Sequence, residues 1–384
     1  MIEKNARVIA FYLPQFHPTE VNDKYWGKGF TEWTNVAKAK PLFKGHYQPQ
    51  IPSDLGFYDL RLPEIREEQA KMAEECGVEG FCYWHYWFGN GKRVLERPFN
   101  EVLQTGKPDY PFCLGWANHS WSNKTWQKTG HFKQDTVFLE QTYPGDEDYI
   151  AHFYEVLKAF KDPRYIRVDG KPLFLVFNPD DIPDNTHFIE LWRKLARENG
   201  LDGIHFVARA DAVGKFEING KFDFTEHVSE RYQSYLEMGY DAINSTTFRL
   251  AEIKSEGTFR VLIRNVMRHL IGGISGERYD YKKIMQNFYT EEDRQENVYP
   301  QLCPRFDKTP RMGKEARMYT HSTPEAFQDS VHSALEIIKS KEEQHKILFL
   351  QAWNEWGEGM YMEPDIKFQH GYLDALKEEI VRHE

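Results

Sequence analysis

Cysteine is scarce in this sequence, and no pattern uses it as a metal ligand. The 384 residues include four cysteines, and none forms the C-x-x-C spacing typical of zinc sites. They lie in or beside apolar segments, at Cys76, Cys82, Cys113 and Cys303. We therefore expect buried free thiols in a reducing compartment, rather than disulfides or a zinc centre.

Long hydrophobic runs are also absent. No stretch of about 18 apolar residues occurs, so the sequence predicts no membrane span. Residues 1–7 run directly into an apolar segment, without the hydrophobic region and small-residue cleavage site of a signal peptide. We expect a cytoplasmic protein, or a periplasmic one if a signal peptide has been removed.

The sequence lacks an excess of positive charge. Lys and Arg total 49 against 59 Asp and Glu, which gives a formal net charge of −10. Nucleic acids and anionic membrane surfaces are bound through basic patches. Neither is therefore expected as a partner.

Motifs for nucleotides, serine catalysis and metals are missing as well. There is no phosphate-binding loop, no G-x-G-x-x-G after a strand and no G-x-S-x-G elbow. The segment 146–148 has the acid-x-acid form with which many sugar-nucleotide transferases hold a metal, but it opens a predicted helix, where the helix dipole favours acids. We expect no cofactor and no metal. A site built from scattered histidines is a less favoured alternative, and these are His17, His85, His119 and His227.

Aromatic residues, in contrast, are abundant, with 10 Trp, 21 Tyr and 27 Phe. Some of them belong to the core. Tryptophan and tyrosine beyond the needs of a core suit the apolar faces of sugar rings. Composition alone leaves both uses open.

Apolar segments of strand length alternate with segments of helical periodicity along the chain. Helices are expected at 61–76, 93–104, 146–160 and 187–199, after Ser322 and from about residue 369. Strands are expected near 8–13, 78–83, 111–119, 173–177, 204–208, 222–227 and 299–303 and from residue 347. This alternation predicts an α/β protein with a single (β/α)8 barrel domain over residues 1–384, with long loops and an insertion near 228–298.

The eighth expected strand leads into the most informative segment of the chain. The apolar run from Ile347 changes abruptly to a stretch with three carboxylates, Glu355, Glu358 and Glu363, among Asn354 and tryptophans such as Trp356. The C-terminal ends of strands are where barrels place their chemistry. A carboxylate pair among aromatic side chains is what cleavage of a glycosidic bond needs. We interpret Glu355 and Glu358 as the catalytic pair.

Aromatic and polar residues also follow the other predicted strands. Because these strand ends meet at one mouth of a barrel, we predict a common substrate-binding site there. Its predicted residues are Tyr12, His17, His85, Trp87, Trp116, Asn118, Glu226, Arg305, Asn354, Trp356 and Glu363.

Several long motifs resemble the WbsX-like proteins, which are described as glycoside hydrolase family 99-like and are named glycosyltransferases by convention. These motifs are Phe11 to Pro18, Gly29 to Trp33, Phe81 to Trp87, Tyr299 to Asp307 and Trp353 to Gly359. The resemblance covers nearly the whole chain. Family 99 comprises retaining endo-α-mannosidases on a (β/α)8 barrel, so the resemblance implies that fold and a carbohydrate-active enzyme.

The resemblance also implies roles for the carboxylates. Glu355 would draw the proton from a sugar 2-hydroxyl, which then attacks the anomeric carbon to give a 1,2-anhydro sugar. Glu358 would protonate the leaving oxygen and later activate water or an acceptor, and Tyr12 would contact the reactive sugar. The leading hypothesis is a retaining glycoside hydrolase or transglycosidase that acts on an α-linked sugar, with manno-configuration as a candidate, in a bacterial polysaccharide or oligosaccharide. The alternatives are a glycosyltransferase of O-antigen or other cell-surface polysaccharide synthesis and a barrel that binds glycan without catalysis.

Overall fold

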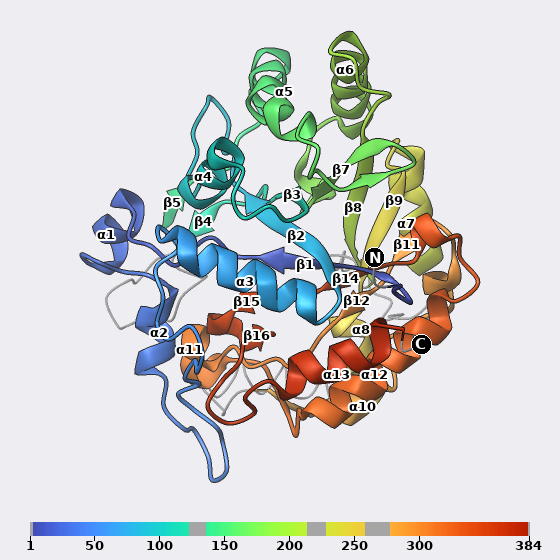
Figure 1. Ribbon diagram of the computed structural model, residues 1–384. Coiled ribbons are helices and arrows are strands. Elements are labelled where there is room, and N and C mark those ends of the chain that lie inside the picture. Colours follow the sequence, from blue (N-terminus) through green and yellow to red (C-terminus); the bar gives the residue numbers. More distant parts are fainter. Residues whose placement is uncertain (1–2, 123–135, 213–227, 258–276, 383–384) are drawn as a thin grey trace, which may run out of the picture.

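The centre of the molecule is a parallel β-barrel (Figure 1). The computed structural model describes residues 3–122, 136–212, 228–257 and 277–382. Neighbouring strands of the barrel pair in the order β11-β9-β8-β7-β3-β2-β1-β14-β12. Their bounds are β1 Arg7–Tyr12, β2 Val78–His85, β3 Phe112–Trp116, β7 Lys171–Val176, β8 His205–Asp211, β9 Ala242–Thr246, β11 Val298–Tyr299, β12 Gln301–Leu302 and β14 Ile347–Leu350.

The segment 298–302 closes the barrel, and Pro300 lies in its middle. It separates β11, which pairs with β9, from β12, which pairs with β14. A proline has no N–H to give to a ladder, so the strand is interrupted at this point. The proline carbonyl still accepts a hydrogen bond from the N–H of Phe349 at 3.0 Å. With β11 and β12 counted as one strand, the barrel has eight strands, and the prediction of a (β/α)8 barrel is confirmed.

Helices surround the barrel and cover its apolar outer face (Figure 1). Those that follow strands are α3 Pro63–Glu75, α4 Arg97–Thr105, α5 Asp146–Phe160, α6 Asn185–Glu198, α7 Val228–Glu237, α8 Phe248–Glu256, α10 Tyr281–Met285, α12 Pro324–Ile338 and α13 Gly371–Ile380. Loop helices are α1 Glu20–Trp26, α2 Glu32–Lys38 and α11 Thr309–Met312. Short strands outside the barrel ladder are β4 Trp121–Ser122, β5 Val137–Leu139, β6 Arg167–Val168, β10 Arg278–Asp280, β13 Met318–Thr320, β15 Asn354–Glu355 and β16 Met360–Tyr361.

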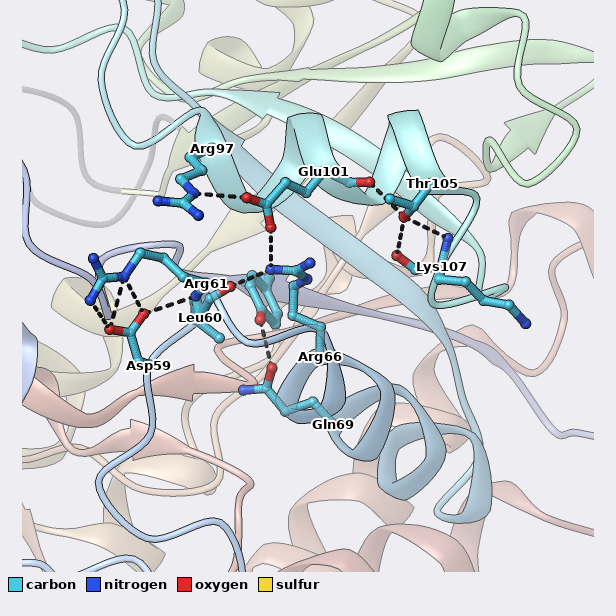
Figure 2. A network of polar contacts seen from close by, with 10 residues as sticks. Asp59, Leu60, Arg61, Arg66, Gln69, Arg97, Glu101, Thr105 and Lys107 are labelled. Atoms are coloured by element: carbon cyan, nitrogen blue, oxygen red, sulfur yellow. Dashed lines mark hydrogen bonds and ion pairs between the residues drawn. The ribbon is translucent and has the colours of Figure 1, made fainter.

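An ion-pair network joins the adjacent helices α3 and α4. Figure 2 shows Arg66 of α3 reaching toward Glu101 of α4, and their charged groups are 2.9 Å apart. Arg97 pairs with the same carboxylate at 2.7 Å, and Arg66 also donates to the carbonyl of Leu60. The buried Arg66 guanidinium is therefore compensated. The network fixes the position of α3, which also carries Gln69 (Figure 2).

The region near 228–298 is not simply an insertion. Within its described part, α7 is followed by β9, which is the sixth strand of the barrel, and by α8. The sixth strand had been expected at 222–227, which lies outside the described residues. The sequence does not reveal β9 because the strand is short and ends in three polar residues, Asn244, Ser245 and Thr246. All of them are buried, but their polarity is typical of an exposed loop. Asn244 is satisfied inside the barrel, since it donates to the carbonyl of Tyr299 at 3.0 Å.

The remaining features of the fold follow the sequence closely. The expected helices appear with ends shifted by a few residues, and the side chain of Asp184 caps α6. All four cysteines are free and buried. None of the helices within the described residues is long and apolar enough to cross a bilayer.

Candidate active site

A cavity of about 300 Å³ opens at the C-terminal ends of the barrel strands. Each strand contributes through its last residues or the loop that follows. The cavity contains aromatic rings, side-chain amides and five cationic groups beside Glu355 and Glu358. Its lining includes Leu13, Gln15, Trp84, Tyr86, His119, Trp121, Phe177, Arg209, Asp211, Phe248, Arg249, Phe306, Lys308, Arg311, Arg317, Gln351, Glu355 and Glu358.

A tight hairpin presents the two glutamates. The strand β15 pairs antiparallel with β16, so that Glu355 lies opposite Met360, and a single 3₁₀ turn carries Glu358 between them. Gly359 has φ +61°, and a Cβ there would approach the backbone nitrogen of Asp307 to 2.8 Å. A Cβ on Gly357 would lie 1.8 Å from Glu32 Oε1. The two glycines therefore permit the turn and the close approach of the neighbouring loops.

Asn354 attaches this hairpin to the end of β1. Its Oδ1 atom accepts from the backbone N–H of Leu13 at 2.8 Å, and its Nδ2 atom donates to the Leu13 carbonyl at 3.0 Å. The side chain is fully buried and both of its polar atoms are used. We therefore assign Asn354 a positioning role for Glu355.

Arg311 of α11 links the carboxylates. Its Nη1 atom lies 3.1 Å from Glu355 Oε1 and 2.5 Å from Glu358 Oε1. On its other side, Nη2 is 2.9 Å from Oε1 of the buried Glu32. Lys308 adds a second cation at 3.1 Å from Glu358 Oε1. One guanidinium thus spaces the pair and fixes their orientation toward the cavity.

The two glutamates have different electrostatic surroundings. Burial, and then the charge of Glu358, raises the pKa of Glu355 to about 7. Burial also acts to raise the pKa of Glu358, but Lys308 and Arg311 outweigh it and lower that pKa to about 2. Near neutral pH Glu358 is therefore ionised, and Glu355 is the carboxyl group of the pair that gains or loses a proton.

Comparison with known proteins identifies the family of this chain. The family model described as glycosyltransferase WbsX matches residues 8–376. The chain belongs to the WbsX family. Relatives of this WbsX chain include the uncharacterized protein WxcX of Xanthomonas campestris pv. campestris, strain B100, with 34% identity over 380 residues, which are 98% of this chain and 50% of the relative. The WbsX chain described here thus spans about half the length of the curated relatives that it matches.

Solved structures with a fold similar to this WbsX barrel include glycoside hydrolases. A glycoside hydrolase-like protein superposes with a TM-score of 0.59 at 15% identity, covering 100% of this chain and 96% of the other. A GH99 endo-α-mannosidase from Bacteroides thetaiotaomicron superposes with a TM-score of 0.57 at 13% identity, covering 98% and 96%. At such identities the likeness shows the fold alone, which is the barrel already described.

None of the predicted substrate-binding residues that the structure describes lines the cavity of this WbsX protein. Residues along a strand alternate between its two sides, and several of the predicted residues point outward to the helices. Tyr12 donates to Gln69 of α3 at 2.6 Å, and Glu363 accepts from the same Gln69 at 2.6 Å. Trp356 donates to Glu363 at 2.6 Å. These groups form a closed hydrogen-bonded layer behind the hairpin.

The residues predicted at the ends of β2 and β3 also face outward. His85 lies 2.9 Å from His152 of α5, and burial lowers the pKa of His85 to about 3. Trp87 donates to Asp148 at 3.0 Å. Trp116 is buried in the core and donates to the Trp87 carbonyl at 2.9 Å. These contacts place the four rings between the barrel and α5.

Three further predicted residues are buried away from the cavity, and one is not described. Asn118 donates to the Tyr143 hydroxyl at 2.9 Å and to the Asn178 carbonyl at 2.7 Å. Arg305 pairs with Asp365 at 2.5 Å. His17 is buried, and burial lowers its pKa. Glu226 lies outside the described residues.

The residues that do line the cavity were available from the same motifs. They are the immediate neighbours of the predicted residues: Trp84 and Tyr86 alternate with His85 and Trp87, His119 follows Asn118, and Phe306 follows Arg305. Alternate residues of a strand face opposite sides of the barrel wall, and the predicted residues are those that face the helices instead of the cavity. Arg311 and Lys308 come from an irregular loop after the seventh strand, where no period identifies them.

Metal ligands do not converge at this cavity among the described residues. The four scattered histidines form no common site among the described residues, since His17 and His85 are outside the cavity that His119 lines, and His227 is not described. Elsewhere in the described ranges, ligand atoms of Glu296, Glu342 and His345 lie within 4.8 Å of one another. The last two precede β14, at the barrel end remote from the glutamates.

Proposed function

We propose that this WbsX-family chain is a retaining glycoside hydrolase or transglycosidase that cleaves an α-linked sugar, of which a manno-configured one is a candidate, in a bacterial cell-surface polysaccharide such as an O-antigen. The observation that carries the proposal is the pair Glu355 and Glu358, held by one guanidinium at 3.1 and 2.5 Å in a cavity with aromatic walls. Such a pair can supply the acid and the base of glycosidic cleavage.

The raised pKa of Glu355 supports its assignment as the base, whereas the charge that Glu358 holds in the free protein favours the reversed roles. A carboxylate with a pKa of about 7 is a far stronger base than an ordinary one, so Glu355 suits removal of a proton from a sugar 2-hydroxyl. Glu358, with a pKa of about 2, is ionised in the free protein and must gain a proton to act as the acid. Lys308 is part-exposed at the rim. Its displacement by substrate would remove one of the two cations that lower the pKa of Glu358.

A leaving-group experiment separates this assignment from the reversed one. An acid is needed only when the leaving oxygen is poor, so a Glu358→Gln variant should still cleave an aryl glycoside whose phenol leaves readily. A Glu355→Gln variant should be inactive on both substrates. If Glu355→Gln instead retains the activated substrate and Glu358→Gln loses both, the roles are reversed.

A glycosyltransferase is the second candidate function, and the structure adds an observation in its favour. The cavity carries Arg209, Arg249, Lys308 and Arg317, and cationic side chains of this kind can bind the phosphates of an activated sugar donor. No phosphate-binding motif was found in the sequence. A barrel that binds glycan without catalysis is disfavoured because both glutamates are present and oriented into the cavity.

The deciding experiment is incubation with α-mannans and O-antigen polysaccharides in the absence of nucleotide sugars. Mass spectrometry would detect released sugars, and early-time NMR would report their anomeric configuration. Release with retained configuration that is lost in Glu355→Gln and Glu358→Gln would support the hydrolase. No release, followed by transfer after a nucleotide sugar is added, would favour the transferase. Wild-type rates in either variant would refute the assignment of the pair.

A further inference from the structure

One wall of the cavity is built from the ends of β3, β7 and β8. Arg209 projects from β8, and its guanidinium carbon lies 4.4 Å from the centroid of the Phe177 ring. The His119 ring packs on the same phenylalanine, with centroids 5.2 Å apart. All three side chains line the cavity. Stacking on Phe177 restricts Arg209 while its planar fork of N–H groups stays available for hydrogen bonds.

Arg209 differs from the other cations of this cavity in having no charged partner among the described residues. Arg249 and Arg317 pair with the buried Glu252 at 3.2 and 3.0 Å, and Lys308 pairs with Glu358. Arg209 makes no ion pair with any residue that the structure describes, and its Nε atom is buried without a hydrogen-bond acceptor. The Nδ1 atom of His119, on the same wall, is likewise buried without a partner in the described ranges.

An unpaired guanidinium at this depth is costly. Arginine stays protonated in proteins, and its charge is normally compensated when water is removed. Burial accordingly lowers the pKa of Arg209, while the charges of Asp211, Glu355 and Glu358 act in the opposite direction through space. None of the three forms an ion pair with it. The wall therefore has a cation and two orphaned polar atoms close to the reacting carboxylates, but no acceptor among the described residues.

We propose that Arg209 binds an anionic group on the substrate, either the carboxylate of a uronic acid or a phosphate ester, carried by a sugar next to the bond that Glu355 and Glu358 act on. The proposal rests on the proposed function in that the cavity binds a glycan. The guanidinium fork matches two oxygens of a carboxylate or phosphate. The substrate class is then an acidic glycan rather than a neutral mannan.

Binding measured without turnover tests this proposal. Isothermal titration calorimetry would use the full chain carrying Glu358→Gln. One probe pair is oligomers of α-linked galacturonic acid and the same oligomers after reduction of their carboxyl groups. The other pair is α-mannose 1-phosphate and mannose. The first pair tests the carboxylate source and the second tests the phosphate source.

The expected result is a preference of about tenfold or more for the acidic member of one pair, as for a hydrogen bond to a charged group. Arg209→Gln should remove the preference, and Arg209→Lys should keep part of it. Arg97→Gln, a change at an exposed cation outside the cavity, should leave it intact. Thermal melting would confirm that each variant is folded. Equal or absent binding of both members in both pairs, or a preference that persists in Arg209→Gln, would overturn the proposal.

The outcome is separable from that of the proposed function. A preference for acidic probes that depends on Arg209 would stand even if no polysaccharide is cleaved. Conversely, cleavage of a glycan by the wild type, together with equal binding of both members in both probe pairs, would uphold the hydrolase and refute the anionic subsite.

Discussion

Two carboxylates of the same hairpin segment, Glu355 and Glu363, show how differently the two sides of the barrel wall use one residue type. Burial raises the pKa of both to about 7. Glu355 faces the cavity and contacts the cation Arg311. Glu363 faces the helices and accepts three hydrogen bonds, from Tyr58, Gln69 and Trp356. A perturbed pKa therefore does not distinguish a reactive carboxyl group from a structural one, whereas access to the cavity does.

The largest expected effect comes from exchanging each of these carboxyl groups for an amide. Glu355→Gln should lower turnover by about 10²- to 10⁴-fold, because it removes a proton acceptor from the reaction. Glu363→Gln should keep turnover within a few-fold of wild type. It should lower the free energy of unfolding by about 1–3 kcal/mol, because an amide cannot accept from all three donors. Steady-state kinetics and thermal unfolding of both variants would check this.

The pH dependence of stability serves as the control for that comparison. A glutamate whose folded pKa is raised to about 7 contributes stability below its unfolded pKa, and this contribution is lost as the pH rises through 7. Glu355→Gln should therefore be more stable relative to wild type at pH 8 than at pH 5. The contrast between the two carboxyl groups would fail if Glu363→Gln lost turnover as severely as Glu355→Gln.

Sequence alone was sufficient for the barrel and for the catalytic pair as a hypothesis, but not for the side of the wall that each residue faces. The apolar runs and helix signals depend on local periodicity, which the sequence displays directly. Whether Trp84 or His85 faces the cavity depends on the phase of a period of two, and both choices place aromatic residues on each side. The link from Arg311 to Glu32, Glu355 and Glu358 joins segments far apart in the chain. No local pattern encodes it.

A smaller effect is expected in the pH profile of catalysis. If Glu355 is the base, kcat/KM should rise with pH through about 7, the pKa of that group in the free protein. The charge of Lys308 lowers the pKa of Glu355, so Lys308→Met should shift this limb to higher pH. The shift should reduce kcat/KM several-fold at pH 6. A profile of kcat/KM from pH 5 to 9 would measure it.

Lys314→Met offers a matched control, because Lys314 is an exposed lysine in the same loop that does not line the cavity. It should leave the profile unchanged. A limb that moves equally in both lysine variants would indicate a general charge effect and not a contact at the pair.

The smallest expected effects concern two tryptophans at the end of β2, Trp84 within the strand and Trp87 two residues beyond it. Trp84 lines the cavity, whereas Trp87 donates to Asp148 behind it. Trp84→Phe should raise KM a few-fold with little change in melting temperature, since it reduces an apolar surface for a sugar ring. Trp87→Phe should leave KM unchanged and cost about 1–2 kcal/mol, because the Asp148 carboxylate loses a buried donor. Equal shifts of KM in the two variants would contradict the assignment of Trp84 to the cavity and of Trp87 to the layer behind it. A change of KM in Trp84→Phe and of stability in Trp87→Phe would show that neighbouring aromatic residues of one motif serve separate purposes.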